Sequence, residues 1–199
     1  MPTPRRSQAD RSRSTRATLV ETARALFAER GYANVPADEI VSAAGVTRGA
    51  LYHHFADKKA LFLAVFEDLE AELNAEFKAA AEAAPDQWAG AVTALSRFLD
   101  ACQRPEVVRI ALTDAPAVLG WQGWREVESR HGLGLITEQL DAAIEAGLIV
   151  EAPVPALAQV VLSAVIEAAL MIAHAEDQAL ARTEAEQALL VLLSGLLKR

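Results

Sequence analysis

Residues 35–61 read VPADEIVSAAGVTRGALYHHFADKKAL, and no other segment of the chain is as informative. Residues 36–44 have the composition of a short helix, Gly45 marks a turn, and Thr47 is expected to cap a second short helix. Asp57 then opens a third helix as its capping residue. Two short helices joined by a glycine turn are typical of a helix-turn-helix, whose second helix enters the major groove of DNA.

A set of spaced residues extends this pattern on both sides. The set comprises ARALFAERGY at 23–32, Ile40, AAGV at 43–46, LYHHF at 51–55 and KKAL at 58–61. From Arg16 to about Phe66 the chain therefore resembles the DNA-binding region of the tetracycline-repressor (TetR) family of bacterial transcriptional regulators. The resemblance implies an all-helical dimer in which a variable C-terminal domain binds a small ligand and joins two subunits.

Charge is divided unevenly along this 199-residue chain, whose net charge is −8. Residues 1–60 carry ten Lys and Arg against six Asp and Glu, whereas residues 61–199 carry nine against twenty-one. Basic charge beside the helix-turn-helix suits binding to phosphates, and the acidic remainder is expected to face away from DNA. A chance fluctuation in surface charge is the alternative interpretation.

Apolar residues recur at helical spacing and show no strand-like alternation, which predicts an all-α fold of about nine helices. We expect a flexible basic arm at residues 1–14 and a helix-turn-helix DNA-binding domain at 15–60. A helical ligand-binding and dimerisation domain is expected at 61–199.

Local signals predict several helix boundaries. Gly31 is expected to end the first long helix as a C-cap, and Asn34 to cap the next helix because Pro36 suits a first turn. Residues 113–123 are expected to interrupt helical structure. Thr183 and Glu186 form a capping box that predicts the start of the last helix.

The helix predicted after Thr47 supplies the candidate DNA contacts. Arg48 can pair with guanine, and Gly49 lets the backbone approach DNA closely. The resemblance implies backbone contacts for Thr47, Tyr52, His53 and Lys58, and base contacts for Arg48 and Gly49. Tyr52 as an ordinary core residue is the alternative. His53 and His54 point about 100° apart on a helix, which disfavours a metal site, and His54 is expected to pack within the domain.

Arginines of the expected arm leave two interpretations open, a solubilising tail or non-specific contacts with phosphates and the minor groove. They are Arg5, Arg6, Arg11, Arg13 and Arg16.

The C-terminal region contains large or polar-tipped residues that are candidates to line a ligand pocket, although each could equally be ordinary core or surface. They are Trp88, Phe98, Trp121, Trp124, His131, Met171 and His174. Three polar residues close in sequence to the tryptophans could orient a ligand or simply be solvated, namely Asp114, Arg125 and Glu128. The two last helices are apolar round more than half their circumference, which predicts a four-helix dimer interface or, alternatively, the core of the monomer. The candidate interface residues are Leu157, Val161, Val165, Ala168, Ile172, Leu189, Leu193 and Leu196.

We therefore expect a transcriptional regulator, a homodimeric repressor that binds a palindromic operator on double-stranded DNA and is released by an unknown small-molecule effector. An activator or co-repressor-type regulator of the same fold is the alternative, and a helical protein-interaction module is a more distant one. Catalysis is not expected, since Gly132-Leu133-Gly134 lacks the third glycine of a nucleotide fingerprint. Neither a cofactor nor a metal is expected.

A single cysteine, Cys102, fits a reducing cytosol. The N-terminus lacks a signal-peptide pattern, and the apolar run from Val160 to Ala173 is too short to span a membrane and contains Glu167. These features predict a cytoplasmic protein with no membrane partner.

Overall fold

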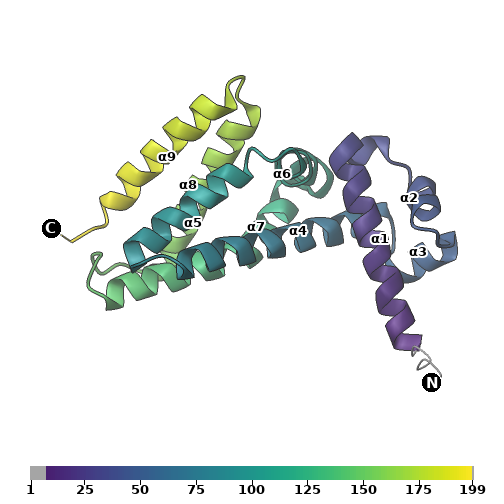
Figure 1. Ribbon diagram of the computed structural model, residues 1–199, viewed down its shortest axis with the longest axis horizontal. Coiled ribbons are helices and arrows are strands. Elements are labelled where there is room, and N and C mark those ends of the chain that lie inside the picture. Colours follow the sequence, from purple (N-terminus) through teal and green to yellow (C-terminus); the bar gives the residue numbers. More distant parts are fainter. Residues whose placement is uncertain (1–7, 199) are drawn as a thin grey trace.

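The computed structural model describes residues 8–198, which are helical over most of their length (Figure 1). The α-helices are α1 Gln8–Arg30, α2 Ala37–Ala43, α3 Arg48–His54, α4 Lys58–Glu82, α5 Gln87–Ala101, α6 Pro105–Val107, α7 Ala115–Glu145, α8 Val154–His174 and α9 Gln178–Ser194. A 3-10 turn at Tyr32–Asn34 and a π-helix at Val108–Asp114 complete the helical elements. The all-α prediction is confirmed.

Helices α1 to α3 form a head at one end of the molecule, and α5 to α9 form a body at the other (Figure 1). Helix α4 begins in the head and runs into the body, where it packs against α5 and α7. The two ends of the molecule are therefore joined by one continuous helix.

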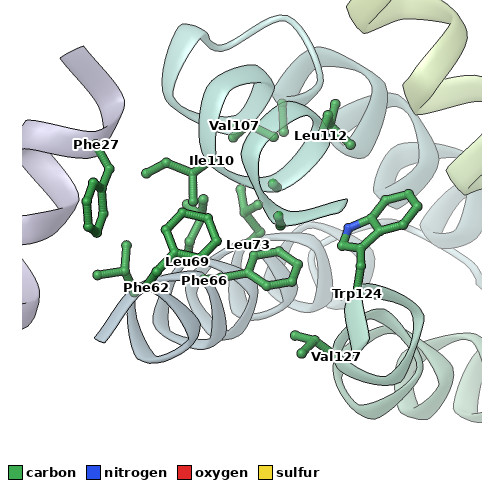
Figure 2. Packing of buried hydrophobic residues seen from close by; sticks show 14 of the residues in the cluster. Phe27, Phe62, Phe66, Leu69, Leu73, Val107, Ile110, Leu112, Trp124 and Val127 are labelled. Atoms are coloured by element: carbon green, nitrogen blue, oxygen red, sulfur yellow. The ribbon is translucent and has the colours of Figure 1, made fainter. Parts of the chain in front are cut away.

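The head has an apolar centre to which each of its helices contributes. Phe27 of α1, Ile40 of α2 and Leu51 of α3 are fully buried, together with Phe62 of α4. The rings of Phe27 and Phe62 meet edge to face with centroids 5.4 Å apart. Figure 2 shows Ile110 of the π-helix beside these rings, so the body contributes to the same packing. Each such side chain stabilises the fold by about 1.5–3 kcal/mol.

Two of the predicted N-caps are confirmed. Thr47 Oγ1 accepts a hydrogen bond from the Ala50 N–H at 3.1 Å, and Asp57 Oδ1 accepts one from the Ala60 N–H at 2.7 Å. Each bond satisfies an N–H group that has no partner in the first turn of its helix. These caps fix where α3 and α4 begin.

The predicted cap of α2 is wrong. Asn34 lies in the 3-10 turn, and its Nδ2 donates to the carbonyl of Arg30 at 2.8 Å, so its side chain is turned back onto α1. Pro36 occupies the cap position without a side-chain bond. Gly31 does end α1 with a positive φ of 78°, and its ψ of 156° belongs to a region open essentially to glycine.

Helix α1 begins at Gln8, so residues 8–14 of the expected arm are helical. That part of the chain has no glycine or proline, and Asp10 in the first turn interacts favourably with the helix dipole and pairs with Arg13 at 2.5 Å. Residues 1–7, with Arg5 and Arg6, lie outside the described residues.

The predicted interruption at residues 113–123 is reduced to the end of the π-helix at Asp114 and to Gly120. This residue adopts φ 77° and ψ 160° inside α7, and the chain on either side of it is helical. Pro116 lies in the first turn of α7, where its missing N–H costs nothing. The irregularity before α7 is the π-helix, a form often found at functional sites.

Helix α9 begins five residues before the predicted capping box. Asp177 caps it by accepting a hydrogen bond from the Leu180 N–H at 2.9 Å. Thr183 lies inside the helix, and its hydroxyl donates to the carbonyl of Ala179 at 3.0 Å. The cap of α9 is therefore Asp177 and not Thr183, so the predicted start of this helix is wrong.

Helix α8 is, within residues 8–198, the one helix long and apolar enough to cross a membrane. It has 21 residues, so the shorter run expected from the sequence understated its length. It packs against α7 and α9, and buries a row of side chains that includes Leu162, Ile166 and Ile172. Of its most apolar 18 residues 33% are buried in the chain, and length and composition alone do not separate a core helix from a membrane helix.

Candidate DNA-binding surface and ligand cavity

Helix α3 presents two different sides. Leu51 and Phe55 are buried against the head, with 0% and 5% of their surface exposed. The exposed side contains Thr47, Arg48, Gly49, Tyr52 and His53. Tyr52 is 45% exposed to solvent, so the alternative that it is an ordinary core residue is wrong. Five of the six candidate DNA contacts thus lie together on one accessible surface.

Arg48 is held loosely by its neighbours on this surface. Its Nη1 lies 3.3 Å from the carboxylate of Asp38, and its guanidinium carbon lies 5.7 Å from the centroid of the Tyr52 ring. Both members of the ion pair are more than half exposed, and such pairs contribute at most about 1 kcal/mol. The guanidinium can therefore leave Asp38 for a base or a phosphate at little cost.

Lys58, the sixth candidate, is turned towards the head interior. Its Nζ donates to the carbonyls of Tyr32 at 2.9 Å and Val35 at 3.1 Å, and lies 3.9 Å from the centroid of the Tyr32 ring. Burial lowers the pKa of Lys58. Tyr32 begins the 3-10 turn and Val35 directly follows it, so Lys58 ties α4 to this turn. A contact between Lys58 and phosphate stays a prediction that requires these bonds to open, whereas Lys59 is exposed.

His54 is half-buried beside Phe55, in agreement with the expectation that it packs within the head. Burial lowers the pKa of His54, and the nearby charges of His53 and Arg16 lower it further. Arg16 lies over the Phe55 ring at 5.3 Å, so this arginine of the expected arm packs on the head. In the described part of the chain, no group of three or more His, Cys, Asp or Glu could hold a metal ion.

Polar contacts join the head to the body at the base of α1. Arg24 of α1 pairs with Glu106 of α6 at 2.7 Å and with Glu72 of α4 at 2.6 Å. The backbone N–H of Tyr32 donates to Asp114, the last residue of the π-helix, at 2.7 Å. The start of the body therefore contacts the loop that leads into α2.

The body contains a cavity of about 160 Å³ between α4, α5, α7 and α8, with Leu193 of α9 on its edge. Its wall is mainly apolar. Phe98 is the one predicted pocket residue in this wall, and Trp124 lines an adjoining cavity of about 30 Å³ together with Phe98. A pocket in the body was thus expected correctly, but most of its residues were not.

Five predicted pocket residues lie elsewhere. Trp121 and Met171 are 62% and 54% exposed, and His174 is exposed as well. Trp88 and His131 are half-buried but are absent from the walls of both cavities. Size and polarity therefore did not predict position, because which side of a helix faces the cavity depends on its neighbours. The bend at Gly120 places Trp121 at the surface while Trp124 is fully buried.

Two acids, Glu70 of α4 and Glu128 of α7, line both cavities. Glu128 is one of the polar residues that the sequence offered as ligand-orienting groups, whereas Glu70 was not predicted. Each is 8% exposed. Burial raises the pKa of Glu128 to about 7, although Arg125 opposes the shift. Burial also raises the pKa of Glu70 well above its ordinary value, and Glu128 adds to this effect.

A signal for Glu70 was present in the sequence. Phe66, Leu73 and Phe77 are all buried on α4, and Glu70 occupies the position between them at the same three- and four-residue spacing. An acid on an otherwise apolar helix face is a strong sign of a buried carboxyl.

The residues predicted for a dimer interface lie mostly on the sides of α8 and α9 that face the rest of their own chain. Ala168, Ile172 and Leu189 are buried within the monomer, and Val161, Val165 and Leu193 line the cavity. Leu157 and Leu196 are half-buried beside the small cluster around Leu140 and Ile149. The exposed apolar residues of α8 and α9 are instead Val160, Met171, Leu180, Val191 and Leu192. When a helix is apolar round more than half its circumference, the spacing of its apolar residues does not reveal which side faces its own chain.

Comparisons with known proteins identify both parts of the chain. Residues 19–65 match the model of bacterial regulatory proteins of the tetR family, and residues 88–196 match the tetracyclin repressor-like C-terminal domain. The crystal structure of a TetR-family transcriptional regulator from Pectobacterium atrosepticum is 40% identical, with a TM-score of 0.88, over 98% of this chain and 99% of that chain.

Two curated relatives agree with this result. The transposon Tn10 TetC protein of Escherichia coli is 28% identical over 138 residues, which are 69% of this chain and 70% of that protein. The HTH-type transcriptional repressor AcnR of Corynebacterium glutamicum is 43% identical over 56 residues, and this match spans less than a third of either chain. The chain belongs to the TetR family and is a DNA-binding transcriptional regulator.

Proposed function

We propose that two copies of this chain bind a palindromic operator as a homodimeric repressor, and that a small molecule in the body cavity releases them. The observation that carries the proposal is the exposed side of α3. Arg48, Gly49 and Tyr52 are accessible there while Leu51 anchors the helix from behind. A recognition helix reads base edges with the residues of its first turns, which are these.

The exposed side of α8 and α9 supports the dimer. Val160, Val191 and Leu192 are each more than half exposed, although such residues are rarely gathered on the surface of a monomer. A second copy related by a two-fold axis would cover them with the same residues of its own. Two α3 helices could then enter successive major grooves about 34 Å apart.

Helix α4 supports the release step, because it contributes to both sites. Glu70, Asn74 and Phe77 line the cavity, whereas Lys58 at the other end of the helix bonds to the head. A ligand that binds better to one arrangement of α4 than to another shifts the population of DNA-binding heads. On this proposal residues 15–60 bind DNA, residues 61–199 bind ligand and partner, and the protein acts in the cytoplasm.

A mobility-shift titration on the DNA upstream of the chain's own gene tests the proposal. We expect a complex of two chains per palindrome, whose affinity falls steeply as salt rises from 50 to 200 mM, as for about six or more phosphate contacts. Scrambling one half-site should abolish the complex. Failure to shift the intact palindrome at low salt, or a complex with one chain that ignores the scrambled half-site, would overturn it.

A further inference from the structure

Two carboxyl groups lie in the wall of the body cavity without a basic partner. Glu70 comes from α4 and Glu128 from α7, and the walls of the two adjoining cavities contain no Lys or Arg among residues 8–198. Asn74 and Gln139 are the other polar side chains of the larger wall, and the rest is mainly aliphatic or aromatic. The cavity therefore combines acidic groups with an apolar interior.

Burial of two carboxyl groups without a basic partner reduces the stability of the folded protein. Transfer of an unpaired carboxylate to an apolar environment costs several kcal/mol, and well-packed apolar residues at such positions are often more stable. Arg125 is close enough to oppose the raised pKa of Glu128, but its Nη2 donates to Ser163 Oγ at 3.2 Å and it forms no salt bridge with Glu128. Burial thus shifts both acids towards the protonated form.

A third polar group in the same place lacks a partner. The indole of Trp124 is fully buried and lines the smaller cavity beside Glu70 and Glu128. Its Nε1 lies near the Glu128 carboxyl, but within residues 8–198 it makes no hydrogen bond of acceptable geometry. Figure 2 shows the Trp124 ring at the edge of the apolar cluster, with its nitrogen facing that cluster. Buried polar groups are normally satisfied, so three unpartnered groups around one cavity point to a ligand.

We propose that the cavity receives a small organic cation, in which one aromatic or similarly sized apolar group carries an ammonium that lies between Glu70 and Glu128. The proposal deepens the ligand-release function proposed above, and it rests on that function only for the step from binding to DNA release.

Size and chemistry both favour this class. A cavity of about 160 Å³ is close to the 150 Å³ of an engineered cavity that holds benzene. The rings of Phe77 and Phe98 meet edge to face, 5.8 Å between centroids, and both line the wall. A cation supplies the charge that the carboxyls lack and can also interact with ring faces. An anion would meet two like groups, and a neutral molecule would leave them uncompensated.

Binding of such a cation would change the relation between α4 and α7. The two carboxyls would ionise and release their protons. Both carboxylates would then be attracted to the same ammonium, and this shared contact would connect Glu70 of α4 with Glu128 of α7. Glu70 is twelve residues from Lys58, or about 18 Å along α4. The nearby titratable groups are Arg125 on α7 and the Cys102 thiol, whose pKa burial raises, so neither competes for the released protons near neutral pH.

Isothermal titration calorimetry of the full-length protein, without DNA, tests the proposal with benzylamine, phenyltrimethylammonium, benzyl alcohol and benzoate. We expect both cations to bind at least tenfold more tightly than the alcohol, and benzoate to bind most weakly. Repetition in buffers of different ionisation enthalpy should reveal proton release with the cations. Equal affinity for cation and alcohol, a preference for benzoate, or no binding of either cation at millimolar concentration would overturn it.

Isosteric variants locate the site. Glu70→Gln and Glu128→Gln should each weaken benzylamine binding at least tenfold and reduce proton release, while their affinity for benzyl alcohol should change less than threefold. Glu145→Gln, at an exposed position, is the matched control and should bind benzylamine as the wild type does. Folding is checked by melting temperature, which should stay equal or rise because Gln is neutral. Unchanged benzylamine affinity in both buried variants contradicts the assignment.

A separate operator measurement distinguishes the two proposals. Benzylamine that binds but leaves the DNA complex intact would remove the release step and keep the cavity assignment. A protein that binds benzylamine as expected but never binds its operator would contradict the proposed function alone.

Discussion

The backbone N–H of Tyr32 donates a hydrogen bond of 2.7 Å to Asp114, although 82 residues separate the two. Tyr32 follows the glycine that ends α1, and Asp114 ends the π-helix before α7. The extra residue per turn of a π-helix shifts the side chains after it, and here the carboxylate lies against the head. The bond is therefore a direct link between the head and the body.

Removal of this link should cost stability. Asp114→Ala leaves the partly buried Tyr32 N–H without its acceptor, for which we expect a loss of about 1–3 kcal/mol in the free energy of unfolding. Asp114→Asn keeps an acceptor oxygen and should lose less. Urea denaturation measures both, with the exposed Asp141→Ala as control. Equal stability of all three variants and the wild type would contradict the structural role of the bond.

Arg48 and Tyr52 should affect DNA binding in different ways. Arg48→Ala should relax base preference at one operator position by about 1–3 kcal/mol, because a bidentate contact with guanine is lost. Tyr52→Phe removes one hydroxyl and should weaken binding to all sequences alike. Fluorescence anisotropy on a panel of single-base operator variants, at fixed salt, separates the two patterns. The reverse pattern, or no change in either variant, would show that α3 does not read the bases as proposed.

Lys58 should matter for stability as well as for DNA. Lys58→Ala removes the donor to the carbonyls of Tyr32 and Val35, so we expect a loss of about 1–2 kcal/mol in the free energy of unfolding. Its exposed neighbour provides a matched control, since Lys59→Ala should change stability by less than about 0.5 kcal/mol. Thermal denaturation at pH 7 compares them. Indistinguishable melting temperatures would mean that the inward bonds are not maintained in solution.

Stability should fall as pH rises through the range set by Glu128. The folded protein holds a proton on this carboxyl up to a pKa of about 7, whereas the unfolded chain releases it near 4.5. Between these values the folded state binds more protons, so the free energy of unfolding decreases with rising pH, by ~3 kcal/mol at most. Glu128→Gln should flatten the decline between pH 5 and pH 8, as measured by urea midpoints. Glu145→Gln should retain the wild-type slope, and an unchanged slope in the Glu128 variant would refute the explanation.

A charge on the exposed side of α9 should separate the dimer. Val191 is 71% exposed in the single chain, so Val191→Glu is tolerated by the monomer but would place two carboxylates in the proposed interface. Sedimentation velocity should show monomers for this variant and dimers for the wild type. Ala75→Glu, at an exposed position of α4, is the control and should remain dimeric. A dimer that survives the Val191 change must use another surface.

The head was predictable from local chemistry. Thr47 and Asp57 were recognised as caps because a hydroxyl or carboxylate before a helix satisfies the free N–H groups of its first turn. Leu51 and Phe55 are buried and Tyr52 is exposed, which the four-residue spacing of the two apolar residues on one side of α3 accounts for. Asn34 failed as a cap because a short turn directed its amide to the preceding helix.

The body was less predictable, for a physical reason. Helices α8 and α9 are apolar on most sides, so their pattern is compatible with several packings, and the helices around them select one. Packing between helices likewise decides that Trp121 is exposed to solvent and that Trp124 is buried in the core.

Periodicity and caps were therefore sufficient to predict an all-helical fold in which α3 exposes Arg48 and Tyr52, and the resemblance of residues 16–66 to the TetR family supplied the prediction of a regulator. Long-range packing was needed to bring Glu70 next to Glu128, to turn Lys58 inward and to join Tyr32 to Asp114. Such pairings depend on where separate helices meet in space, and the free energy that selects them comes from burial shared among many residues. No local window of sequence contains that information.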